Sequence, residues 1–535
     1  MAQSQPYTVA CDGGLVKSAN SIDLLRTPGV ARELRNFEVS TEGGYRRING
    51  FAKYGGGSAV QPTGGTATIL GVFPYADGVI VAAGTNIYFS NTGTSWLQIN
   101  RSSVAGSGDN HTAFTGRSVL ARTGQGQCQF ALFEGATFDY GQVIISDGAN
   151  EPYIFRMEGT GALNTRTFFA EEITVTSTKH VKYITTHDKH LIAAGVEDNL
   201  NTVFYSSTLD PTSFSGTGSG NIVLEDQIEG IKGFRNELFI FCTNSIFKLI
   251  NINDSSNVAI VPVTKNVGCS SGYSIQEIGG DLIFLAPDGL RTVAGTARIG
   301  DVELGTVSKE IQPLVTDLTE SINSYIITSL VLREKSQYRL FYTDTSKLNS
   351  EQRGIIGTLR PNGFQWSETR GIEVTEIGSG FDQNGIENYY HGDTDGFIYV
   401  HDSGNDFNGS KILARYATPD YDYGDLGTLK TLHYLKVSTS AEGVVEPDVQ
   451  VRFDYGSTDI PQPPNPFDLG VIDPPSLFGE ALFNTNVFGG AENPLIRVAL
   501  QGSGHSNSFT VISDDTKAPY TINGLYINYV PSGRR

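Results

Sequence analysis

The chain has 535 residues, more than one hydrophobic core usually supports, so two or three domains, or one large closed ring with an appendage, are expected. Its formal charge of −19 disfavours sequence-specific binding of duplex DNA, because that affinity comes largely from Lys and Arg, although the same acidity would also keep a large β protein soluble. No apolar run is long enough to span a membrane and no secretory signal is recognisable, which predicts folding in a reducing cytoplasm.

The composition favours an all-β fold. The chain has 62 glycines and 10% aromatic residues, as expected for many short strands joined by tight turns. Helical periodicity is nearly absent. The best helix candidate is the segment from Ser308 to Leu318, where Ser308 could cap the helix and Pro313 would limit it to a turn or two.

Residues 1–60 come before any repeat and predict an extended N-terminal arm. Glycine turns bracket three apolar positions, Leu34, Phe37 and Val39, which suits one strand that pairs elsewhere. In closed propellers such a strand often completes the last blade. The pair Arg46 and Arg47 is interpreted as a solvated face or an ion pair between subunits, since a lone basic pair on an acidic protein rarely binds phosphate.

The segment from Phe234 to Ile250 contains the clearest repeating unit. Leu238 to Phe241 is a short apolar run, Thr243 to Ser245 make a turn, and Ile246 to Ile250 form a second apolar run. This pattern predicts a hairpin that is buried on both faces. Because one hairpin is not stable alone, other copies are expected to stack against it.

The chain contains seven such units, whose second strands start 44 to 64 residues apart. That spacing is close to the roughly 40 to 50 residues of a four-stranded propeller blade. The starts are Val79, Val143, Leu191, Leu238, Leu282, Leu340 and Tyr389. The sequence therefore predicts a β-propeller of six or seven blades over residues 61–402.

Two short patterns within the propeller could bind metal ions. Asp393 and Asp395 place oxygen ligands on alternate residues, as calcium loops do, but the downstream Glu is missing, so a tight turn is favoured and the metal site stays open. His187 and His190 are three residues apart and would lie on opposite faces of a strand, which favours a turn.

The pattern changes after Asp402. A polar linker, Gly404 to Ser410, precedes five or six alternating strands over residues 411–535, which predict a small, separate C-terminal β-sandwich. The Pro-rich segment from Pro461 to Asn484 is too long for an ordinary hairpin connection and predicts an exposed excursion.

No catalytic, cofactor-binding or metal-binding residue is assigned, and no enzyme activity is expected. The eight histidines form no HExxH pattern, and no phosphate-binding glycine loop occurs between a strand and a helix. Carboxylate pairs that meet only in the fold leave a glycosidase open. The four cysteines have no metal spacing and are expected to stay reduced: Cys11, Cys128, Cys242 and Cys269.

The order of the parts is similar to that of the nozzle proteins of short-tailed bacteriophages, also called tail tubular or packaged-DNA stabilisation proteins. The resemblance covers nearly the whole chain. In the arm it rests on Asn36 to Val39, Gly43 to Arg47 and Gly50-Phe51, together with the hairpin from Phe239 to Ile250. At the C-terminus it rests on Gly502 to Gly504, Phe509 to Ile512, Gly524 to Ile527 and Gly533 to Arg535.

The resemblance implies a structural protein of the virion tail, assembled in the cytoplasm of the bacterial host. Six copies would form a channel below the tail adaptor, through which genomic DNA passes without specific binding, and would carry tail fibres or spikes. The alternative is a carbohydrate-binding or glycan-hydrolysing propeller of a phage tail, which needs carboxylates and aromatics converging at the centre of the ring. A secreted scaffold or adhesin would need an export signal.

In a ring of acidic subunits, strand-mediated or apolar contacts must overcome charge repulsion. The N-terminal arm and the Pro-rich excursion are the candidates for these contacts. The sequence therefore predicts that deleting either segment prevents assembly and leaves the propeller folded.

Overall fold

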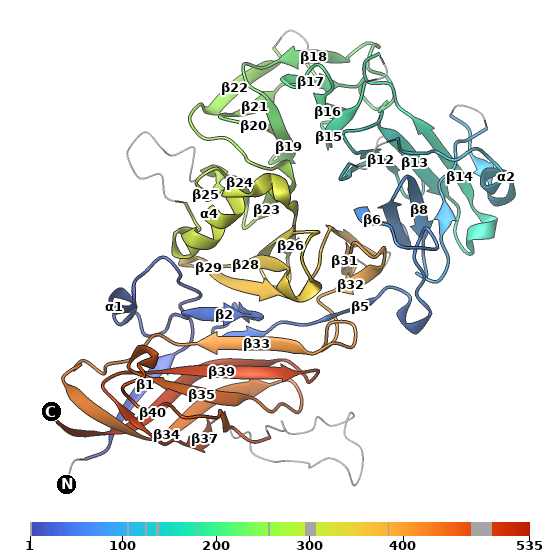
Figure 1. The fold of residues 1–535 in the computed structure, drawn as a ribbon. Helices are drawn as coiled ribbons and strands as arrows, with labels where there is room; N and C mark the ends of the chain where they lie inside the picture. The colour runs from blue at the N-terminus through green and yellow to red at the C-terminus, as the bar shows by residue number, and fades with distance from the viewer. Residues whose placement is uncertain are drawn as a thin grey trace.

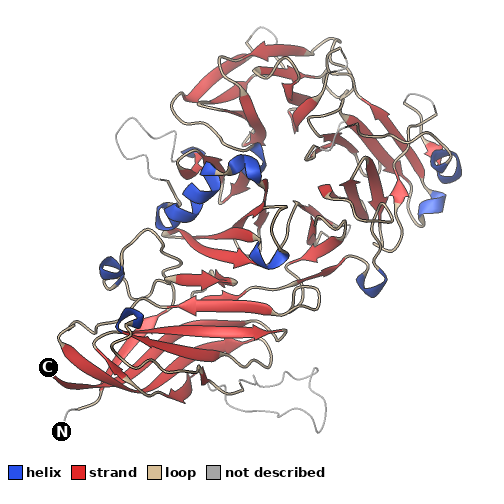
Figure 2. Ribbon diagram, viewed as in Figure 1, coloured by secondary structure: helices blue, strands red, loops and turns tan. Residues whose placement is uncertain are grey.

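The computed structural model describes residues 3–103, 106–123, 126–134, 138–177, 179–254, 257–294, 306–382, 385–471 and 495–534. Strands dominate it, with a few short helices between and beside them (Figure 2). The predicted all-β class is confirmed. The helices are α1 (Ser21–Leu24), α2 (His111–Thr115) and α4 (Gln312–Glu320), with 3-10 turns at Gly56–Ser58, Leu163–Thr165, Gly272–Ser274, Lys309–Ile311, Ile322–Ser324, Asn349–Glu351 and Asp454–Gly456.

Small antiparallel sheets surround a common centre and form a β-propeller (Figure 1). The first four sheets follow one another along the chain. Their strands are β6 (Ile69–Tyr75), β7 (Gly78–Ala83), β8 (Asn86–Ser90) and β9 (Leu97–Gln98); β10 (Asp109–Asn110), β11 (Gln129–Phe133), β12 (Gln142–Ser146), β13 (Tyr153–Glu158) and β14 (Thr167–Glu172); β15 (Val181–His187), β16 (His190–Val196), β17 (Thr202–Tyr205) and β18 (Gly220–Val223); and β19 (Ile228–Phe234), β20 (Glu237–Cys242), β21 (Ile246–Ile250) and β22 (Ala259–Thr264).

Three further sheets complete the circle. They consist of β23 (Gln276–Ile278), β24 (Asp281–Ala286) and β25 (Gly289–Thr292); β26 (Ile326–Leu332), β27 (Gln337–Thr343), β28 (Arg353–Arg360) and β29 (Gly363–Arg370); and β30 (Glu376–Phe381), β31 (Glu387–Gly392), β32 (Ile398–His401) and β5 (Phe51–Lys53). Within the described residues, six radial sheets stand alone, and β26–β29 take the remaining position but continue into a larger sheet.

The ring closes where the last sheet meets the first. Strands β30 and β31 lie against β6, and β5 of the N-terminal arm pairs with β32, Val400 opposite Ala52. The expectation that an arm strand pairs elsewhere is confirmed, and it completes the last blade.

The repeat predicted from the sequence corresponds to the second strand of each sheet. Every predicted start falls in one of these strands: β7, β12, β16, β20, β24, β27 and β31. Two of the preceding turns, Asp188-Lys189 and Arg235-Asn236, have left-handed φ at both residues, the geometry of a two-residue hairpin turn that matches strand twist. In β20 the five residues after Glu237 are all buried. The periodic apolar runs in the sequence therefore reflect strands that are buried on both faces.

Two large sheets form the C-terminal part and enclose a common hydrophobic core. One has the order β3-β4-β40-β34-β37, with β1 and β38 also paired to it, and the other has the order β26-β27-β28-β29-β2-β33-β39-β35-β36. The strands not yet given are β1 (Gln5–Ala10), β2 (Glu33–Arg35), β3 (Phe37–Val39), β4 (Tyr45–Arg47), β33 (Ile412–Ala417), β34 (Thr428–Ala441), β35 (Asp448–Phe453), β36 (Phe467–Asp468), β37 (Leu495–Ala499), β38 (Ser503–Gly504), β39 (Asn507–Asp515) and β40 (Tyr520–Arg534).

The arm connects the propeller to the C-terminal sheets. Strand β2 lies between β29 and β33, with Arg35 opposite both Glu368 and Arg415. Strands β1 and β4 both pair with β40. The core around Leu34 and Phe37 also contains residues of β24, β27 and β39, so these parts share one core and one continuous sheet.

Three local expectations need correction or lie partly outside the described residues. Pro313 lies in the first turn of α4, where its missing N–H leaves no hydrogen bond unmade, so it does not limit the helix, which has nine residues. The Ser308 hydroxyl does not cap this helix and instead accepts a hydrogen bond from the Leu290 N–H. Arg46 and Arg47 are not on a solvated face: Arg46 pairs with Glu38 and Glu442, and Arg47 is 1% exposed. Of the Pro461 to Asn484 excursion, residues 472–484 lie outside the described residues.

Candidate functional site

A buried network of charges joins the arm to the propeller. The Arg339 guanidinium lies 2.9 Å from Glu38 Oε2 and 2.9 Å from Asp402 Oδ1. Lys335 contacts the same two carboxylates at 3.0 and 2.7 Å, and Arg46 adds a third cation 2.9 Å from Glu38. Arg339 and Glu38 are each 2% exposed, so neither charge is compensated by bulk water.

Electrostatics in this network keep Asp402 ionised and the nearby histidines neutral. Burial opposes ionisation of Asp402, but Arg339 and Lys335 hold its pKa below the ordinary value. Burial lowers the pKa of His391 to about 3. The pKa of His401 is also lowered, mainly by burial and in addition by His391 and Arg339. The network is therefore a fixed electrostatic contact between strands that are distant in sequence.

The first strands of the radial sheets surround a central channel with a cavity of about 330 Å³. Polar side chains from six of these strands line it, among them Gln129, Thr185, Lys232, Gln276, Thr328 and Glu376. Among the described residues that line this cavity, Glu376 is the one carboxylate. Its oxygens accept hydrogen bonds from Gln127 Nε2 at 2.8 Å and Thr328 Oγ1 at 2.9 Å.

Glu376 should make the stability of the protein fall as pH rises. Burial raises the pKa of Glu376 from its ordinary 4.5 to about 8, so between these values the folded chain keeps a proton that the unfolded chain has lost. Stability from this group is complete below pH 4.5 and is lost toward pH 8. We expect the free energy of unfolding to drop by more than about 1 kcal/mol over this window.

Urea denaturation between pH 5 and 8.5 measures this effect as the slope of the free energy of unfolding against pH. The Glu376→Gln variant should lose the slope, whereas Glu277→Gln, an exposed position on the first strand of another radial sheet, should keep it. Equal slopes in all three proteins would show that Glu376 is ionised at neutral pH.

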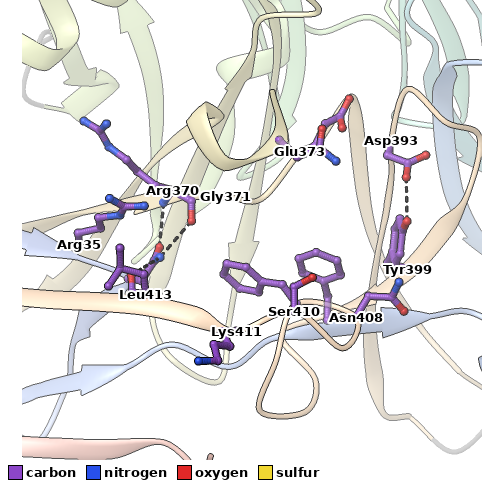
Figure 3. A pocket seen from close by; sticks show the side chains of 14 residues that line it. Arg35, Arg370, Gly371, Glu373, Asp393, Tyr399, Asn408, Ser410, Lys411 and Leu413 are labelled. Carbon is purple, nitrogen blue, oxygen red and sulfur yellow. Dashed lines mark hydrogen bonds between the residues drawn. The ribbon is translucent and has the colours of Figure 1, made fainter. Parts of the chain in front are cut away.

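A second cavity, the junction pocket, lies where the arm, the last two radial sheets and the linker after Asp402 meet (Figure 3). It has a volume of about 420 Å³. Asn36, whose φ is 53°, fixes one wall: its side-chain amide donates to the carbonyls of Arg370 and Leu413 at 3.0 and 2.9 Å, and its Oδ1 accepts the Arg370 N–H at 2.8 Å.

The junction pocket has two ends of different charge. Arg35 and Arg370 lie together at one end, and Glu373 and Asp393 lie toward the other (Figure 3). The rings of Phe51 and Phe407, which also line the pocket, stack 5.1 Å apart at 16°.

The acidic end is held by the Asp393 turn. Asp393 Oδ1 accepts the Phe397 N–H at 2.8 Å, and the Tyr399 hydroxyl donates to Oδ2 at 2.8 Å. The Thr394 hydroxyl donates to Glu373. Burial raises the pKa of both Asp393 and Glu373; the charge of Asp393 adds to the shift at Glu373, and the charge of Asp395 adds to the shift at Asp393.

The other residues singled out in the sequence have structural roles here. Asp393 to Gly396 form a tight turn, and no group of three or more His, Cys, Asp or Glu side chains is arranged to hold a metal ion in the part of the chain that the structure describes. His187 and His190 flank a hairpin turn, and His190 is buried against the Ser206 carbonyl. All four cysteines are free and buried. No helix among the described residues is long and apolar enough to cross a membrane.

No protein-family model matches this sequence, and no curated protein sequence matches it. Solved structures show only distant similarity. The extracellular domain of a one component system from B. thetaiotaomicron aligns with a TM-score of 0.34 and 11% identity over 66% of this chain and 40% of that one. The Pan2 WD40 domain of Neurospora crassa has a TM-score of 0.26 and 9% identity over 62% of this chain and 74% of that one.

An exo-beta-1,3-galactanase from Phanerochaete chrysosporium aligns over 90% of this chain and 100% of its own, with a TM-score of 0.24 and 10% identity. This chain spans about two fifths of the length of the B. thetaiotaomicron domain. At such low TM-scores none of their activities transfers to it.

Proposed function

We propose that this chain is a structural protein of the virion of a short-tailed bacteriophage, a subunit of the tail nozzle. In this proposal six copies assemble in the host cytoplasm below the tail adaptor, and the ring carries tail fibres or spikes. The observation that carries the proposal is the interlocked arm. Its strands pair in the last radial sheet and in both C-terminal sheets. The propeller and the C-terminal sheets are thereby joined into one body that can transmit mechanical force.

Charge supports a passive channel for DNA. The chain has 57 acidic and 38 basic residues, and each cation on a channel wall would add a counterion-release contribution to DNA affinity. The charge network at Arg339 pairs its cations with carboxylates of the same subunit, so those cations are not available to phosphates. An acidic subunit would therefore contribute few phosphate contacts to a channel formed by several copies.

The carbohydrate alternative needs a pair of carboxylates at the centre of the ring. The described lining of the channel has the single carboxyl of Glu376, which accepts hydrogen bonds from its own neighbours. A hydrolytic site at the ring centre therefore has no support from the channel geometry. The two carboxyls that do face one cavity, Glu373 and Asp393, lie in the junction pocket.

An amber mutation in the gene for this chain tests the proposed function. In a non-suppressing host we expect filled heads without a tail nozzle, which lose their DNA on storage and do not infect. A suppressing host that inserts the natural residue should restore tailed, infectious particles. Normal tails and normal infectivity without the chain would contradict the proposal.

A further inference from the structure

The basic end of the junction pocket holds one more cation than it can pair. Across the sheet, Arg35 lies between Arg415 on β33 and Glu368 on β29. Arg370 forms an ion pair with Glu368, with 2.7 Å between Nε and Oε1, and Arg415 Nε lies 3.4 Å from Glu33 Oε1. Among the described residues Arg35 is left without an ion pair, and its Nε is buried with no hydrogen-bond partner.

Arg35 repels Arg415, because like charges on directly opposed strand residues repel, and the opposed carboxylate on its other side, Glu368, is shared with Arg370. Burial and the charge of Arg370 lower the pKa of Arg35, the charges of Glu368 and Glu33 offset part of that shift, and Arg35 keeps its positive charge at neutral pH. A carboxylate in the pocket would relieve this repulsion through the paired N–H groups of the guanidinium. Lys411, an exposed residue that also lines the pocket, adds a second positive charge.

The opposite end is suited to hydroxyl groups. Glu373 and Asp393 are buried carboxyls that accept hydrogen bonds from Thr394 and Tyr399 hydroxyls, and they present oxygens beside the cavity. The side chains of Asn408 and Ser410 line the same cavity and can donate or accept. This end offers both donors and acceptors of hydrogen bonds.

The apolar lining and the size of the cavity restrict the ligand further. Phe51 and Phe407 contribute aromatic surface on which the C–H face of a sugar ring can pack. The volume of about 420 Å³ falls in the range of roughly 300–1,000 Å³ that is typical of small-molecule sites.

From the unpaired Arg35, the facing carboxyls and the aromatic surface, we propose that the junction pocket binds a carboxylated sugar residue of the uronic acid type. The sugar carboxylate pairs with Arg35 and Lys411, and the ring hydroxyls bond to Glu373, Asp393 and Asn408. The site recognises the same chemistry in a free monosaccharide and in one unit of an acidic polysaccharide. It is independent of the proposed virion role, so either proposal can fail without the other.

Isothermal titration calorimetry with D-glucuronic acid, a trimer of galacturonic acid and D-glucose tests the proposal. The wild-type protein should bind both acidic ligands, and glucose about ten-fold or more weakly, because it lacks the group that pairs with Arg35. If the trimer binds much more tightly than the monosaccharide, the source is a polysaccharide. Similar affinities indicate a single free residue.

Arg35→Gln should weaken glucuronate binding about ten-fold or more, and Arg26→Gln, an equal change of charge at an exposed arm position, should leave it unchanged. If Arg35→Gln does not fold, Lys411→Gln at its exposed position should still reduce affinity. The proposal is overturned if the wild type does not bind glucuronate, if these pocket variants bind it as the wild type does, or if acetate, glycine or glucose bind equally well.

Discussion

Replacing Arg339 with methionine should lower the free energy of unfolding by about 3–5 kcal/mol, because it leaves Glu38 and Asp402 buried with too few cations. Methionine keeps most of the volume of the side chain, so the loss reports charge more than packing. Urea denaturation at pH 7, followed by circular dichroism, measures the change. Lys335 would still contact both carboxylates, which places the expected loss within this range and not above it.

The matched control for Arg339→Met is Lys265→Met. Lys265 lies 3.0 Å from Glu225, but these side chains are 56% and 80% exposed, so losing that pair should cost less than about 1 kcal/mol. If the two variants lose similar amounts of stability, the Arg339 network does not hold the arm to the propeller.

Deleting residues 1–54 should abolish folding of the whole chain. The sequence alone predicted that such a deletion prevents assembly and leaves the propeller folded, and the structure makes that prediction untenable. Leu34, Phe37 and Tyr45 are fully buried in the core that joins the propeller to the C-terminal sheets. The deletion also removes β5, which would leave β32 with an open edge. Soluble yield and far-UV circular dichroism measure the result.

Co-expression of residues 1–54 as a separate peptide provides the control for this deletion. Because the arm strands pair with strands of the rest of the chain, supplying them as a separate peptide should restore soluble, β-rich protein. A deletion variant that melts at the temperature of the intact chain would show that the arm is dispensable for folding.

The repeats could be predicted from the sequence because their second strands are buried on both faces. A continuous apolar run such as Leu238 to Phe241 depends on its own residues and needs no knowledge of distant partners. The places of β2, β3 and β4 could not be predicted in this way. Each has three residues, and β2 pairs with strands more than 300 positions away in sequence, so its register carries no local signal.

The sites were less accessible to sequence reasoning than the fold. Asp393 was singled out, but as one half of a metal pattern, and its partner in the pocket, Glu373, belongs to the segment before β30. Arg35 carries no local signal, because its lack of a partner follows from how β2 is placed between β29 and β33. Glu376 is one of two glutamates between Ile372 and Ile377, so the sequence alone does not separate it from Glu373.

The oligomeric state of the purified chain tests the proposed nozzle role most directly. Mass photometry, alone and after mixing with the tail adaptor protein, resolves one copy of the 57.7 kDa chain from a ring of several copies. We predict closed rings of six copies, seen as annular particles in negative stain, with no retention of duplex DNA at physiological salt. A stable monomer in the presence of the adaptor, or tight and steeply salt-dependent DNA binding, would contradict the proposal.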